Sequence, residues 1–451
     1  MHLRSRRKLI AALTVVFLIG GVMLILASQG FSLNIKKGVI EKRGGLFLKF
    51  APSDATLLIN GKEKRVRENF LSQGVFVSNL APDTYRILLQ KEGFVSWEKE
   101  MRVHPGIVSS ESNIRLWPVN PVFVEQTSST KTFWITKEGV ITKDTKGNLA
   151  FGEKILRGTE VEFVDVSDSV IITRLESTFF LTNLSSPQES LNISDLFLSL
   201  KERQLFLPGV VPIEHIMPHP FNNEKVLITT QTSLYVLDTK KIELDRLLTT
   251  ARIQSALARS SQEAFLIDSQ SNLIVVNLIF KTSSRFPLRN LAAQRMEVTP
   301  DGTHILIIHN NNTLSAYNIE DRSFQELAPS VSDFALSPEH KRVALVNGKA
   351  IEVFLLEEYY EENRKWERES SFSLPETEES AIKLLWPAGL PGHIVTLNRN
   401  GDLMIQEVTP TLPVNSALIA KNVNQVLSEG RKIFFSREGD ILSIFDTDQN
   451  K

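Results

Sequence analysis

The fold class is decided by one stretch of the chain, Arg295-Met-Glu-Val-Thr-Pro-Asp-Gly302, Thr303-His-Ile-Leu-Ile-Ile308, Asn310-Asn-Asn312 and Thr313-Leu-Ser-Ala-Tyr-Asn-Ile319. Short apolar runs alternate here with clusters of Pro, Asp, Gly and Asn. Runs of this length, rich in Ile and Val and bounded by turn residues, are typical of β-strands joined by tight turns. The stretch therefore predicts three consecutive antiparallel strands.

The same pattern recurs along most of the chain, for example over Phe334–Leu355 and Gln425–Phe445. One residue near the start of the second strand marks each copy, and we call it the anchor of that copy. Five of the seven spacings between anchors lie between 36 and 41 residues, close to the repeat of a four-stranded propeller blade. We therefore expect an all-β chain with a seven- or eight-bladed β-propeller over residues 113–451. The eight anchors are Trp134, Val170, Val226, Ala264, Ile305, Val343, Ile394 and Ile433.

The last copy has only three strands, so closure of the ring needs a strand from the other end of the array. Ile114–Leu116 and Val122–Val124 are both candidates for it. Two long spacings indicate insertions. We expect a short helix over Ser194–Phe206, capped by Ser194, and a projecting hairpin over 356–368 with its turn near Asn363.

That hairpin segment is a candidate docking element for a partner. Tyr, Trp and Arg are favoured as anchors of protein interfaces, and they are interleaved here with charges of both signs. A solvated hairpin without a partner is the alternative, and the mixed charge argues against nucleic acid. The candidate docking residues are Tyr359, Tyr360, Arg364, Trp366 and Arg368.

Residues 9–27 form an uncharged apolar run of 19 residues, and four basic residues lie within the preceding tail, 1–8. A helix of this length would be roughly 28 Å long, enough to cross a bilayer core of about 30 Å. We predict a transmembrane signal-anchor with a cytoplasmic tail, a tether over 28–44 and the remaining chain outside the membrane. A cleaved signal peptide is the alternative, although its apolar region would be unusually long.

Residues 45–112 carry short strand-like runs and closely spaced turns, which suit a small antiparallel sandwich. Their turns resemble those of PEGA domains, although Asp54 and Asp83 stand where that family usually has glycine. This resemblance implies an extracytoplasmic module without established catalysis. The propeller repeats resemble WD-repeat-like and TolB-like bacterial propellers without the Gly-His and Trp-Asp signatures. The PEGA-like turns are Pro52-Ser-Asp-Ala55, Leu58-Ile-Asn-Gly61, Leu80-Ala-Pro-Asp-Thr-Tyr85 and Gly93-Phe94.

Composition and motifs offer little chemistry. The chain has no cysteine, which excludes disulfides, thiolate catalysis and Cys-ligated metals. Its 51 Lys and Arg balance 52 Asp and Glu, so a dedicated nucleic-acid binder is disfavoured. His215 and His219 have zinc-helix spacing, but Pro218 would break that helix, so a propeller loop is preferred. Asp144-Thr-Lys-Gly-Asn148 is interpreted as an ordinary turn, and a calcium loop starting at Asp446-Thr-Asp448 is disfavoured. We predict no metal, no cofactor and no catalytic residue.

These observations favour a non-enzymatic binding or scaffold protein, anchored in the membrane of a bacterial cell and exposed at its surface. Its partner would be a protein or a cell-wall polysaccharide, bound through the propeller. Two alternatives stay open: a propeller hydrolase or lyase with an axial active site, and a solute-sensing module. The sequence does not identify the partner, the pathway or the oligomeric state.

Overall fold

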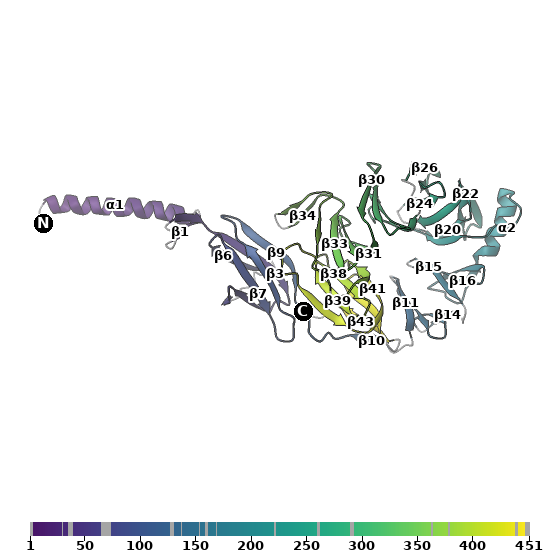
Figure 1. The fold of residues 1–451 in the computed structure, drawn as a ribbon, viewed down its shortest axis with the longest axis horizontal. Coiled ribbons are helices and arrows are strands. Elements are labelled where there is room, and N and C mark those ends of the chain that lie inside the picture. Colours follow the sequence, from purple (N-terminus) through teal and green to yellow (C-terminus); the bar gives the residue numbers. More distant parts are fainter. Residues whose placement is uncertain are drawn as a thin grey trace.

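The computed structural model describes residues 3–28, 30–34, 39–64, 74–126, 130–136, 138–152, 154–157, 161–167, 169–220, 222–258, 262–288, 293–361, 364–377, 379–437 and 441–446. Within them the chain forms two helices and 43 strands, so the predicted all-β class is confirmed for the folded body. Figure 1 shows an extended N-terminal helix, a small β domain beside it and a ring of sheets at the other end.

Helix α1 (Leu3–Ser28) is the first element of the chain, and it contacts β1. The segment predicted as a tether contains a two-stranded hairpin, β1 (Phe31–Asn34) with β2 (Val39–Lys42). Within the residues that the structure describes, no helix is both long and apolar enough to cross a membrane. The span predicted for 9–27 is therefore not confirmed.

The small domain is a sandwich of two sheets with strand orders β6-β3-β9 and β5-β4-β7-β8. Strands β3 and β9 pair in parallel and the other pairs are antiparallel. One apolar core lies between the sheets and includes Leu46, Leu57, Ile87 and Trp97. The strands are β3 (Gly44–Ala51), β4 (Thr56–Ile59), β5 (Lys62–Lys64), β6 (Val75–Leu80), β7 (Thr84–Gln90), β8 (Trp97–Arg102) and β9 (Val108–Arg115).

The two aspartates that depart from the PEGA pattern keep ordinary backbone conformations. Neither Asp54 nor Asp83 has a positive φ, so glycine is not required at either position. Asp83 accepts a hydrogen bond from the amide of Thr84, and Asp54 pairs with Lys91. The departures are therefore compatible with the sandwich.

Eight four-stranded antiparallel sheets follow, and they form the blades of the propeller. Blade 1 holds β11 (Thr130–Thr136), β12 (Gly139–Asp144), β13 (Leu149–Phe151) and β14 (Lys154–Arg157); blade 2 holds β15 (Glu162–Val166), β16 (Val170–Leu175), β17 (Thr178–Asn183) and β18 (Ser190–Asn192); blade 3 holds β19 (His215–His219), β20 (Asn222–Thr229), β21 (Ser233–Asp238) and β22 (Glu243–Thr249); blade 4 holds β23 (Ile253–Ala258), β24 (Glu263–Asp268), β25 (Asn272–Asn277) and β26 (Thr282–Pro287).

The other four blades complete the ring. Blade 5 holds β27 (Ala293–Val298), β28 (His304–His309), β29 (Leu314–Asn318) and β30 (Ser323–Ala328); blade 6 holds β31 (Val331–Leu336), β32 (Arg342–Asn347), β33 (Ala350–Leu355) and β36 (Ser371–Ser373); blade 7 holds β37 (Ala381–Leu385), β38 (His393–Asn398), β39 (Leu403–Glu407) and β40 (Ser416–Ala420); blade 8 holds β41 (Val423–Glu429), β42 (Lys432–Arg437), β43 (Ile441–Asp446) and β10 (Val124–Gln126).

An apolar core lies between every pair of neighbouring blades, and this closes the ring. The interface between blades 8 and 1 buries Phe133 against Phe434 and Leu442. The seven other interfaces are filled in the same way. Burial of apolar surface between blades thus stabilises the ring without a covalent link. The prediction of seven or eight blades resolves to eight within the described residues.

The closing strand is β10, which pairs antiparallel with β43 through Val124 and Ile444. Of the two candidates from the sequence, Val122–Val124 overlaps this strand at Val124 only, two residues too early, whereas Ile114 belongs to β9 of the sandwich. Seven of the eight repeat anchors lie in the second strand of a blade. Trp134 is the exception: it lies in β11, the first strand, and stacks on Phe163.

Both predicted insertions are present. Helix α2 (Ile193–Leu205) occupies the first, but its N-cap is Asn192 and not Ser194. The Asn192 side chain accepts a hydrogen bond from the amide of Asp195, while the Ser194 hydroxyl accepts one from the amide of Phe179. The second insertion is the hairpin of β34 (Tyr359–Glu361) and β35 (Arg364–Trp366), which pair antiparallel. The predicted turn near Asn363 lies outside the described residues.

A buried junction joins the sandwich to blade 7. Lys99 Nζ lies 2.8 Å from Glu407 Oε1, and both side chains are almost fully buried. The Trp97 indole donates to the same carboxylate at 3.2 Å, and Asn415 bonds to both the amide and the carbonyl of Glu98. Since these bonds cross between domains in a buried setting, they fix the sandwich on the propeller.

Candidate functional site: a cavity on the propeller axis

The first strands of most neighbouring blades contact one another and form the inner ring of the propeller; the contacting pairs are β15 with β19, β19 with β23, β23 with β27, β31 with β37, β37 with β41 and β41 with β11. In blades 5, 6 and 7 the pairing with the second strand shifts between the first and third residues of this inner strand. The third residues are Arg295, Asp333 and Lys383. A β-bulge redirects the side chain that follows it. Three charged groups from three blades therefore occupy equivalent positions.

Blades 8, 1 and 4 have a polar residue at this position, namely Gln425, Thr132 and Ser255, after the same shift. We call the six residues the axial belt. Gln425 bonds to both the amide and the carbonyl of Phe133 in the next blade, and Asp333 accepts from the amide of Leu384 in its next blade. Belt side chains therefore also link neighbouring inner strands.

The charged part of the belt converges on Asp333, whose side chain is only 5% exposed. Arg295 Nη1 lies 2.8 Å from Asp333 Oδ1, and Lys383 Nζ lies 3.2 Å from Asp333 Oδ2. The Leu384 amide adds a third donor at 2.8 Å. With three donors, two of them charged, the buried carboxylate is fully compensated.

Arg295 also pairs with Glu297 at 3.1 Å, and its guanidinium lies 4.6 Å from the centre of the Phe334 ring. Burial lowers the pKa of Arg295, but the bonds to Asp333 and the charges of Glu297 and Asp333 outweigh it, so the pKa lies above its usual value. Arg295 is therefore a permanent cation at the edge of the cavity.

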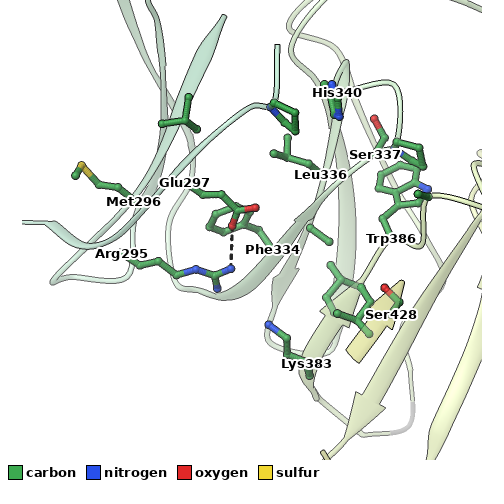
Figure 2. Close-up of a pocket in the computed structure, with 17 residues that line it drawn as sticks. Arg295, Met296, Glu297, Phe334, Leu336, Ser337, His340, Lys383, Trp386 and Ser428 are labelled. Carbon is green, nitrogen blue, oxygen red and sulfur yellow. Dashed lines mark hydrogen bonds and ion pairs between the residues drawn. The ribbon is translucent and has the colours of Figure 1, made fainter. Parts of the chain in front are cut away.

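A cavity of about 830 Å³ opens beside this cluster, between blade 5 on one side and blades 6 and 7 on the other (Figure 2). Its volume falls in the range of sites that bind small molecules or peptide side chains. Apolar and aromatic groups form much of its wall. They include Met296, Phe334, Leu336, Leu385 and Trp386.

Ser337 and His340 lie at one end of the cavity, yet they are not arranged as a nucleophile and base. The Ser337 hydroxyl accepts the amide of Arg342 at 3.0 Å, and its carbonyl accepts the amide of His340 at 2.9 Å. In the part of the chain that the structure describes, no hydrogen bond joins the two side chains. Both residues thus hold the loop after β31, and the geometry does not favour nucleophilic catalysis.

The cavity, the hairpin and the sandwich lie on one face of the propeller. First and third strands of a blade run in the same direction, so the loops after β31, β33, β37 and β39 all emerge on this face. The Leu356 amide at the hairpin base donates to the Lys341 carbonyl, next to His340 of the cavity. Trp386 of the cavity donates to the Pro391 carbonyl, two residues before His393 at the junction.

The candidate docking residues fall on this hairpin. Tyr359, Tyr360, Arg364 and Trp366 belong to β34 and β35, and their side chains lie outside the described residues. Arg368 follows β35 and pairs with Asp321 of blade 5 at 3.1 Å. Arg368 therefore fixes the hairpin base to the neighbouring blade, and its predicted contact with a partner stays a prediction.

The two histidines with zinc-helix spacing lie in β19, a strand and not the expected loop. Four residues along an extended strand span about 13 Å, too far for two ligands of one zinc ion. Burial, with a contribution from Lys225, lowers the pKa of His219. The pair is therefore part of blade 3.

Comparison with known proteins gives structural similarity only. No protein-family model matches the chain, and no curated protein matches its sequence. The solved β-propeller domain of Cps50 (Swd1) from Myceliophteria thermophila is similar over 65% of this chain and all of its own, with 10% identity and a TM-score of 0.40. BamB from Moraxella catarrhalis is similar over 72% of this chain and all of its own, with 10% identity and a TM-score of 0.45.

A third similar structure is the tricorn protease, with 11% identity and a TM-score of 0.41 over 78% of this chain and 38% of that protein. At this level the likeness concerns the fold alone. The propeller is established by the eight sheets and their interfaces, and the PEGA resemblance stays a prediction.

The axial cluster was missed in the sequence because its members are 38 and 50 residues apart. One signal for it exists: each member is the third residue of an inner strand. Within the repeats Arg295 and Asp333 both stand five residues before a proline, Pro300 and Pro338. A charged residue at a position that faces a propeller channel is a site candidate.

Proposed function

We propose that this chain is a non-enzymatic binding protein that takes a protein partner on the face that carries the hairpin and the axial cavity. One observation carries the proposal: the cavity and the hairpin lie together on the face to which the sandwich is fixed. A projecting element beside a concave, partly apolar site is the geometry that protein recognition uses. No observation of comparable weight supports the alternative function, in which the cavity would bind a substrate for hydrolysis.

We further propose that α1 anchors the chain in a membrane and that the sandwich and propeller lie outside it. Support comes from the uncharged run 9–27 and the basic tail before it. The side chains of Val16, Phe17 and Leu24 are more than 60% exposed, so the apolar surface of this helix is not covered by the rest of the chain. A membrane is the environment in which such a surface is stable.

The function is tested with the full chain, extracted from membranes and used to capture partners after mild cross-linking. Deleting residues 357–368 should abolish capture, because the hairpin is removed while β33 and β36 keep their pairing. Replacing both Tyr359 and Trp366 by alanine should weaken capture by roughly thirtyfold, the effect of losing interface anchors.

The matched control replaces Lys240 and Lys241 by alanine on the exposed turn after β21 of blade 3, which emerges on the same face but three blades away from the hairpin of blade 6. This variant should capture the partner as the parent does. Undiminished capture by the hairpin deletion, with an unchanged melting temperature, would overturn the proposed role of this face.

A further inference from the structure

We propose that the axial cavity binds a carboxylate attached to an aromatic or aliphatic group, with Lys383 and Arg295 as its cationic contacts. The inference rests on the proposed function and names the chemistry of the partner group that enters the cavity. A peptide C-terminus and an acidic side chain next to an apolar residue both present this chemistry.

The charge of the buried cluster is the first argument. Two cations, Arg295 and Lys383, share one buried anion, Asp333. Glu297 also pairs with Arg295. Glu297 is about as exposed as Arg295, at 42% against 40%, and it lines the same cavity, so it offsets the charge of Arg295. Lys383 shares its carboxylate, Asp333, with Arg295 and pairs with no second carboxylate in the described part of the chain, so its ammonium is the group that an incoming anion would pair with.

The geometry of the two cations is the second argument. Asp333 accepts a hydrogen bond from Arg295 and forms an ion pair with Lys383. Arg295 donates a second bond to Glu297, so both the ammonium and the guanidinium keep further N–H groups. Both side chains stay partly exposed, at 34% and 40%. Figure 2 shows Lys383 and Arg295 directed toward the same space beside Phe334. Asp333 thus positions two donors before a ligand arrives, which lowers the cost of binding.

The apolar wall is the third argument. Met296, Leu336 and Leu385 line the same cavity as the cations. A bare inorganic anion would leave this wall in contact with water, whereas an apolar group beside the carboxylate would cover it. The combination selects a mixed ligand over phosphate or sulfate.

The test measures binding of N-acetylphenylalanine to the full chain in detergent by saturation-transfer NMR. Its uncharged amide, N-acetylphenylalaninamide, is the matched ligand. We expect a dissociation constant of about 1 mM for the acid, as is typical of a fragment, and at least about fivefold weaker binding of the amide. Equal binding of acid and amide, or no binding of either, overturns the proposal.

Two variants move the affinity in opposite directions. Lys383→Gln should weaken binding of the acid about fivefold to tenfold because it removes a charged donor. Glu297→Gln should strengthen it about twofold because Arg295 loses a competing anion. The control is Lys281→Gln, which removes a lysine paired with Asp245 in the same manner on the outer edge of blade 4.

Lys383→Arg keeps a cation and should retain binding. It is the control for Lys383→Gln, because it shows that a substitution at this position does not by itself unfold the chain. Inorganic phosphate is the competing probe. Displacement of the acid by an equal concentration of phosphate would show a plain anion site and overturn the mixed-ligand proposal. If the hairpin variants abolish capture while the acid and amide bind equally, this inference fails and the proposed function stands.

Discussion

His393, a single residue at the junction, makes the free energy of unfolding depend on pH. Its side chain is buried and meets the Trp117 ring edge-on, with ring centres 5.4 Å apart. Burial lowers its pKa to about 4, although the nearby Glu407 carboxylate opposes this shift. Glu407 itself is buried, which raises its pKa, but the charge and bonds of Lys99 and the amide of Asn415 outweigh this and the pKa falls below its usual value.

Acid should therefore weaken the fold before most carboxylates titrate. Between pH 6.5 and 4 the unfolded chain binds a proton at position 393 that the folded chain does not, so unfolding becomes easier as the pH falls. The loss should reach roughly 3 kcal/mol at pH 4, and the lowered pKa of Glu407 acts in the same direction. Urea unfolding at pH 7, 5.5 and 4.5 measures it.

His393→Phe keeps a ring on Trp117 and removes the titrating group. Its free energy of unfolding should vary less with pH over this range than that of the parent. His215→Phe serves as the control, because His215 is exposed in β19. An identical pH slope for His393→Phe and the parent would exclude His393 as the source.

The candidate site shows that a functional site cannot be predicted from the types of single residues alone. The sequence pattern selected aromatic and basic residues of the hairpin because they are typical of interfaces. Asp333 gave no such signal, since an isolated acidic residue in a strand of mixed polarity is common. Its importance comes from Arg295 and Lys383, which only the ring brings to it.

At the scale of elements, α2 was predicted with nearly correct bounds and an incorrect cap. Ser and Asn are both good N-caps, so the residue type alone could not separate Ser194 from Asn192. The tertiary contact decided it, because the Ser194 hydroxyl bonds to the amide of Phe179 in β17.

Asn192→Ala should destabilise the propeller by about 1 kcal/mol, the usual cost of losing an N-cap. Asn192→Ser keeps an acceptor at this position and should lose much less, whereas an aspartate there would repel Asp195, to which the Asn192 amide donates at 2.7 Å. Thermal unfolding followed by circular dichroism compares the Ala and Ser variants with the parent. Equal losses for Ala and Ser would show that the side-chain acceptor does not stabilise α2.

The misplaced Trp134 anchor has a related cause. Blade 1 is shorter than the others, and its second strand, β12, contains Thr, Lys and Asp beside Val and Ile. The apolar run of β11 therefore resembled the second strands of other blades, although it is an inner strand.

For the whole molecule, closure of the ring depends on three residues from one end of the propeller. β10 supplies the outer strand of blade 8, and Glu125 lies opposite Ser443 of β43. An ion pair between Arg437 and Glu125 supports this contact. Since the chain has no cysteine, a disulfide placed here would be its only one.

Glu125→Cys combined with Ser443→Cys should staple the ring. Opposite residues of antiparallel strands lie within reach of a disulfide, and closing such a long loop should stabilise the fold by roughly 5–6 kcal/mol in the chain-entropy model. The melting temperature of the oxidised double variant should exceed that of its reduced form. No difference between the two forms would mean that β10 does not limit the opening of the ring.

The sequence by itself determined the all-β fold class, and it determined the number of propeller blades to within one. Apolar runs at a nearly constant spacing reveal second strands, because these are buried on both faces between neighbouring blades. It also determined the presence of the projecting hairpin and of the small sandwich, since Asn-Gly and Pro-containing turns act locally.

Only the tertiary structure decided which strand closes the ring, where the sandwich is fixed and which charges meet on the axis. Val124, Glu407 and Asp333 each find their partner tens or hundreds of residues away in the chain. Local sequence preferences do not indicate which residues meet when they lie so far apart in the chain. Closure of the ring creates these contacts, because the same burial that holds the blades together also brings their inner strands side by side.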